Sequence, residues 1–155
     1  MRIQIAALAA SILTASAACA ADFPKKGEAE YDAYYVFRSQ SKMDSAAGSG
    51  GLDELTGITR NVKGEGPFHD MSVRCLMQWT QIGETFASTG SCVETDRDGD
   101  DIFATFDTGT HTIIGGTGKY KGITGTAPYS PDNLHDANGG HWAAVAKHKV
   151  AWEIK

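Results

Sequence analysis

The chain has 155 residues, with 14 lysines and arginines against 19 aspartates and glutamates, and a net charge of −5. This length suits one domain and leaves no room for a separate cofactor-binding domain, so we expect no cofactor. The acidic balance disfavours nucleic acid and anionic membrane surfaces as partners.

Residues 1–20 have the pattern of a secretory signal peptide. A charged start leads into an apolar run over residues 5–13, and Ala18-Cys19-Ala20 forms an A-x-A cleavage site. The run is shorter than the roughly 20 apolar residues of a membrane-spanning helix, so we expect no stable membrane insertion. Cleavage after Ala20 predicts a secreted or periplasmic protein. Lipidation of Cys19 is an open alternative, although Ser16 stands where such a signal has a large aliphatic residue.

The mature chain begins with a polar segment and then shows strand periodicity. Residues 21–30 are expected to form a leader before a folded domain over residues 31–155. From Tyr31 to Phe37 apolar residues alternate with more polar ones, which predicts a strand. Small residues from 45 to 51 predict a flexible loop, and a weaker strand is expected over residues 55–62.

The clearest apolar face in the chain predicts a core strand, in which Met71, Val73, Cys75, Met77 and Trp79 alternate with more polar residues. Residues 85–95 are expected to pair with it. The faces of this second strand are hard to rank, because Phe86 and Cys92 share one face with Glu94. A bulge at Gly90 or Ser91 would reconcile them.

Cys75 and Cys92 are the two cysteines that remain after cleavage. Ile82-Gly83 lies midway between them and has the composition of a hairpin turn, which would bring the cysteines together. An oxidising compartment then predicts a disulfide, and the alternative is two buried thiols.

The second half of the chain predicts further strands over residues 101–106, 111–115 and 123–127. Residues 128–140 contain two prolines, asparagine, aspartate and paired glycines, and are expected to form a long irregular loop. A final strand over residues 141–155 has a nearly unbroken apolar face, which suits closure of a barrel. We therefore predict an all-β fold, a single eight-stranded antiparallel β-barrel.

A glycine-rich corner, Gly116-Thr-Gly-Lys-Tyr-Lys-Gly122-Ile-Thr-Gly125, joins two of these strands and is expected to bury Tyr120 and Ile123. With the preceding segment from Cys92 to Asp100, it resembles the bacterial relatives of the allene oxide cyclase and dirigent barrels, over most of the chain after Tyr31. The resemblance implies an eight-stranded antiparallel barrel that holds an apolar substrate. It implies no catalytic residue, because no signature of the plant cyclases aligns here.

The final strand also suggests a ligand site. Its inward face alternates bulky Trp142 and Trp152 with small Ala144 and Ala146, which leaves space inside a barrel of this size. The expected ligand is a small apolar or aromatic molecule, held by Trp142, Trp152, Trp79, His148 and Glu94. Each of these has an ordinary core role as its alternative. A cofactor-independent cyclase or isomerase, and a structural envelope protein with a filled barrel, stay open.

The turn from Asp96 to Asp101 carries carboxylates at alternate positions, as calcium loops do. Its glycine, Gly99, is one residue early for such a loop, and a strand follows instead of a helix. Asp98-Gly99 is a strong hairpin signal, so we expect solvated acids around a β-turn and no metal site.

Overall fold

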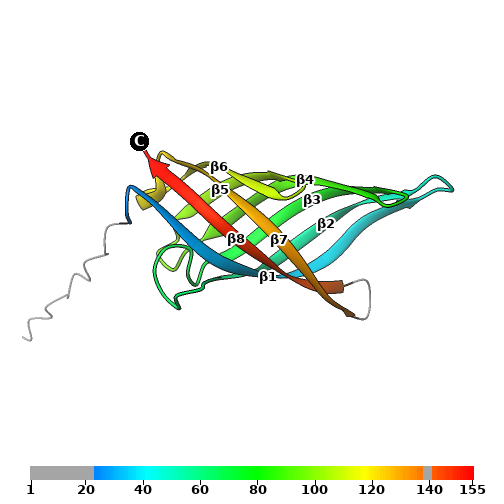
Figure 1. The fold of residues 1–155 in the computed structure, drawn as a ribbon, viewed down its shortest axis with the longest axis horizontal. Helices are drawn as coiled ribbons and strands as arrows, with labels where there is room; N and C mark the ends of the chain where they lie inside the picture. The colour runs from blue at the N-terminus through cyan, green and yellow to red at the C-terminus, as the bar shows by residue number, and fades with distance from the viewer. Residues whose placement is uncertain (1–22, 138–140) are drawn as a thin grey trace, which may run out of the picture.

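The computed structural model describes residues 23–137 and 141–155, so the expected signal peptide lies outside it. Eight antiparallel strands, each paired with its neighbours in the chain, form a closed barrel in which β8 pairs with β1 (Figure 1). The predicted fold class is confirmed. The strands are β1 Lys26–Asp44, β2 Ser49–Asn61, β3 Ser72–Ile82, β4 Thr85–Thr95, β5 Asp101–Asp107, β6 Thr110–Gly116, β7 Ile123–Ala137 and β8 His141–Ile154.

The glycine corner has the predicted form. The 3₁₀ turn η1, Gly118–Tyr120, links β6 to β7, and Gly118 and Gly122 adopt φ of 48° and 84°. Tyr120 and Ile123 are 4% and 0% exposed, so the corner buries both side chains as expected. Among the described residues, no helix is long and apolar enough to cross a membrane.

Three segments that were predicted to lie outside the strands are partly strand. β1 begins at Lys26, inside the expected leader, and β2 begins at Ser49, inside the expected flexible loop of residues 45–51. The irregular loop predicted for residues 128–140 is strand as far as Ala137. β7 tolerates Pro131 because β6 pairs with it only as far as Pro128, so the later part of β7 has β8 as its one described neighbour.

The predicted bulge in β4 is also wrong. The register between β3 and β4 is unbroken from Ser72↔Thr95 to Ile82↔Thr85. Cys92 and Glu94 both point inward and are 2% and 3% exposed. An apolar cysteine and an acidic residue therefore do share the inward face of β4, and the glutamate is buried inside the barrel.

The two ends of the barrel differ. The β1–β2, β3–β4 and β5–β6 hairpins lie at one end, the open end, and the connections β2–β3, β4–β5 and β6–β7 lie at the other, the closed end (Figure 1). An aromatic plug fills the closed end, where the centroids of neighbouring rings lie 4.8 to 6.3 Å apart. The plug consists of Phe23, Tyr31, Phe68, Tyr120 and Trp152. The plug leaves the space inside the barrel toward the open end.

Candidate functional site

The interior toward the open end contains a cavity of about 660 Å³. Phe86 and Leu134 line it and are 47% and 55% exposed, so the cavity reaches the protein surface. Of the predicted ligand-binding residues, Trp79 and Trp142 line this cavity. Trp152 lies in the aromatic plug, where its Nε1 donates a hydrogen bond of 2.9 Å to the Pro24 carbonyl oxygen.

Two stacked aromatic pairs form walls of the cavity. Phe37 of β1 stacks on Trp142 of β8, with ring centroids 4.9 Å apart and planes at 14°. Trp79 of β3 and Phe86 of β4 are 6.4 Å apart at 23°. Such walls supply apolar contact area together with π-faces, which suits a flat or hydrophobic molecule.

Asp53 is a cavity-lining residue that sequence reasoning missed. It is 2% exposed, and neither carboxylate oxygen has a hydrogen-bond partner among the described residues. Burial raises the pKa of Asp53, while nearby Ser39 and Trp79 act in the opposite direction. The alternation of Asp53 with Leu55 would have revealed it if β2 had been expected to begin before residue 55.

His111 and Tyr35 form the inner floor of the cavity and were also missed as site residues. His111 is 5% exposed, and its Nδ1 and the Tyr35 hydroxyl make no hydrogen bond within the described structure. Burial lowers the pKa of His111 to about 4, so its imidazole is neutral near pH 7. The floor therefore offers neutral polar groups to a ligand, and the phase of His111 with buried Ile113 was the available sequence signal.

His148 lies below this floor, on the inward face of β8, and does not line the cavity. Its ring stacks on Tyr31 with centroids 4.5 Å apart and meets the edge of His111 at 4.9 Å. Nδ1 donates to the Ala146 carbonyl oxygen at 3.0 Å, which leaves Nε2 as an acceptor without a donor in the described residues. Burial, and then the neighbouring His111, lower the pKa of His148 to about 3.

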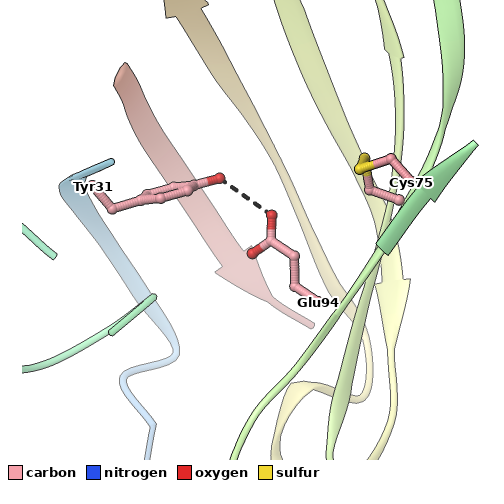
Figure 2. Close-up of a disulfide and its surroundings, with 4 residues drawn as sticks. Tyr31, Cys75 and Glu94 are labelled. Atoms are coloured by element: carbon pink, nitrogen blue, oxygen red, sulfur yellow. Dashed lines mark hydrogen bonds between the residues drawn. A yellow bond between two sulfur atoms is a disulfide. The ribbon is translucent and has the colours of Figure 1, made fainter. Parts of the chain in front are cut away.

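Glu94 and His148 form a buried polar layer below the cavity floor, and Glu94, like His148, does not line the cavity. Figure 2 shows its carboxylate facing the Tyr31 hydroxyl, which donates a hydrogen bond of 3.4 Å to Oε1. No described group pairs with Oε2. Burial raises the pKa of Glu94 to about 7, against the lowering effect of the Tyr31 hydrogen bond. Glu94 can therefore exchange a proton near neutral pH.

The predicted disulfide is present and forms part of the cavity wall. Cys75 and Cys92 are direct partners in the β3–β4 register, with Cα atoms 4.1 Å apart. Figure 2 draws the disulfide at Cys75 in the same region of the barrel as Glu94, which follows Cys92 by two residues on β4. The cross-link therefore fastens the cavity wall next to the buried carboxylate.

The β4–β5 turn differs from the expected solvated acids. Lys119 Nζ lies 2.6 Å from Asp96, 2.5 Å from Asp98 and 3.6 Å from Asp100. Burial acts to raise the pKa of Asp96, but hydrogen bonds from Lys119 and Tyr120 lower it overall. The lysine ammonium thus sits where the three carboxylates converge. This turn contacts the glycine corner at the closed end through Lys119 and Tyr120, and none of its residues lines the cavity.

Comparison of the chain with protein-family models, curated proteins and solved structures finds no match. The resemblance to the allene oxide cyclase and dirigent barrels therefore stays a prediction. The site is interpreted from its own geometry: a cavity with aromatic walls, a buried carboxylate on one wall and a neutral polar floor.

Proposed function

We propose that this protein is a secreted or periplasmic β-barrel, similar to the cyclase and dirigent barrels, that binds a small apolar or aromatic molecule. The cavity of about 660 Å³ carries the proposal. Its size lies in the usual range of small-molecule sites, roughly 300–1,000 Å³, and its walls are mostly aromatic and aliphatic. A structural envelope protein with a filled barrel would lack such a space. The disulfide fits an oxidising compartment.

The test is binding to the mature chain, followed by tryptophan fluorescence because Trp79 and Trp142 line the cavity. The panel contains terpenoid, phenolic and fatty-acid compounds. We expect quenching by at least one class, with affinity that calorimetry places in the micromolar range, since burial of a compact ligand contributes roughly 25 cal/mol per Å².

A pair of variants on β8 locates the binding. Ala144 lines the cavity, whereas Ala151 lies on the exposed outer face of the same strand. Ala144→Trp should fill the cavity and weaken binding at least tenfold, and Ala151→Trp should leave the affinity unchanged. Equal affinities in the two variants would place the ligand elsewhere, and absence of binding by the whole panel would refute the proposal.

A second candidate is a cofactor-independent cyclase or isomerase. The buried Glu94 carboxyl favours it, because a pKa of about 7 is near the optimum for a general acid or base at neutral pH. His111, neutral at that pH, lies at the cavity floor between the ligand space and this layer. Mass spectrometry of a bound compound after incubation distinguishes the candidates: product formation that Glu94→Gln abolishes, with binding retained, would favour the enzyme.

A further inference from the structure

The position of Asp53 indicates the chemical class of the ligand that the cavity binds. This inference rests on the proposed function. In the register, Asp53 faces Ser39 of β1 and Met77 of β3. Phe37 precedes Ser39 by two residues on the inward face of β1, and Trp79 follows Met77 by two on that of β3. Asp53 therefore lies between the Phe37–Trp142 pair and the Trp79–Phe86 pair.

The Asp53 carboxylate has no counter-ion in the cavity. None of the described lining residues is lysine or arginine, and the lining histidine, His111, is held neutral by burial. Neither Asp53 oxygen has a well-formed hydrogen bond from a described group, and the neutral donors nearby, Ser39 and Trp79, only partly offset the effect of burial on its pKa. A buried carboxylate without a cation or a full set of hydrogen bonds is destabilising in general, so such groups are normally paired with a positive charge.

The surrounding aromatic faces point to the same kind of partner. Tryptophan and phenylalanine rings attract organic cations through the negative potential of their π-faces, most strongly where water is excluded. A carboxylate between two stacked aromatic pairs combines charge neutralisation with that attraction. A ligand carboxylate would instead meet Asp53 as a like charge, which weighs against free fatty acids.

We propose that the ligand of this barrel is an apolar or aromatic molecule bearing a basic nitrogen, whose ammonium group lies against Asp53 between the two aromatic pairs. The Asp53 oxygens accept its hydrogen bonds, and the apolar body fills the remaining cavity toward His111 and Tyr35. Trp79 forms one face of the ammonium site.

Three compounds with one aromatic body test this proposal: biphenylmethylamine, biphenylmethanol and biphenyl carboxylate. Calorimetry at pH 7 should show the amine binding roughly 10- to 100-fold more tightly than the alcohol, as expected for hydrogen bonds to a charged group. The carboxylate should bind most weakly. This ranking in the unmodified protein decides the matter even if a variant fails to fold.

Two neighbouring carboxylates supply the variant and its control. Asp53→Asn keeps the shape of the side chain and should reduce the amine preference to about onefold, with the affinity for the alcohol unchanged. Glu54 lies next to it but faces outward, where it pairs with Arg74 at 2.6 Å. Glu54→Gln should keep the full preference.

The outcomes separate the two proposals. Equal binding of amine and alcohol, or a preference that survives Asp53→Asn, would overturn the ammonium site while the ligand-binding function stands. Binding by none of the three compounds, together with none from the wider panel, would overturn both.

Discussion

Glu94→Gln should stabilise the barrel at alkaline pH. The Glu94 pKa is about 4.5 in the unfolded chain and about 7 in the folded one, because burial disfavours the carboxylate. The folded state therefore holds a proton that the unfolded state has lost between these values, and stability falls as pH rises through this window. At 1.36 kcal/mol per pH unit, the loss amounts to about 3 kcal/mol above pH 7.

Urea unfolding of the wild type and of the Glu94→Gln variant between pH 4 and pH 8 measures this effect. The variant should exceed the wild type by about 3 kcal/mol more at pH 8 than at pH 4, because glutamine has no charge to bury. His111 and His148 have lowered pKa values, and their contribution to stability is lost as pH falls below about 6.5. Both proteins contain these histidines, so the difference between their free energies of unfolding is free of that opposite trend.

The reasoning also predicts the effect of the hydrogen-bond partner. Tyr31→Phe removes the donor to Oε1, a bond that favours the charged form, so the pKa of Glu94 should rise further. The pH range over which the free energy of unfolding falls would then extend to higher pH. Identical pH profiles for the wild type and Glu94→Gln would show that the carboxylate is hydrated in the folded state and would refute the burial argument.

Three further results are expected. Reduction of the Cys75–Cys92 bond should lower the free energy of unfolding by roughly 3 kcal/mol, the value for a loop of this length, and thiol titration of unreduced, denatured mature protein, without residues 1–20, should find no reactive cysteine. Millimolar Ca²⁺ should not raise the thermal midpoint, because Lys119 Nζ already lies among three carboxylates; a rise of several degrees that Asp98→Ala removes would contradict this. Gly118→Ala should destabilise by about 1–3 kcal/mol in urea unfolding, since φ is 48° and a Cβ would overlap the Asp100 carboxylate; unchanged stability would contradict it.

The period-two alternation of side chains was the strongest predictive signal in the chain. It identified the inward faces of β3 and β8 and the hairpin that brings Cys75 to Cys92. Side chains on successive strand positions must point to opposite faces, so local sequence suffices for this. The first part of β7, residues 123–127, was predicted, but its polar continuation over residues 128–137 was missed. The two prolines there resemble loop residues until the short β6 is seen to end at its partner Pro128.

The composition of the cavity could be predicted only in part. Trp79, Trp142 and Trp152 are equivalent by alternation, yet the first two line the cavity and the third lies in the plug. Depth along the barrel separates them, and depth depends on the strand tilt and register that closure imposes. Asp53 was missed because its strand was expected to begin only at residue 55. His111 was missed because it is the first residue of the strand predicted over residues 111–115, and its side chain was not considered as part of the inward face.

The sequence by itself therefore determined the inward faces of β3 and β8, the disulfide partners and the class of fold, because each follows from the local period of the chain and from hairpin pairing. Tertiary structure alone decided which inward residues fill the closed end and which line the open one. It also placed Asp53 between two aromatic pairs and buried Glu94 beneath the cavity floor. These relations join residues on different strands, and only closure of the barrel brings them together.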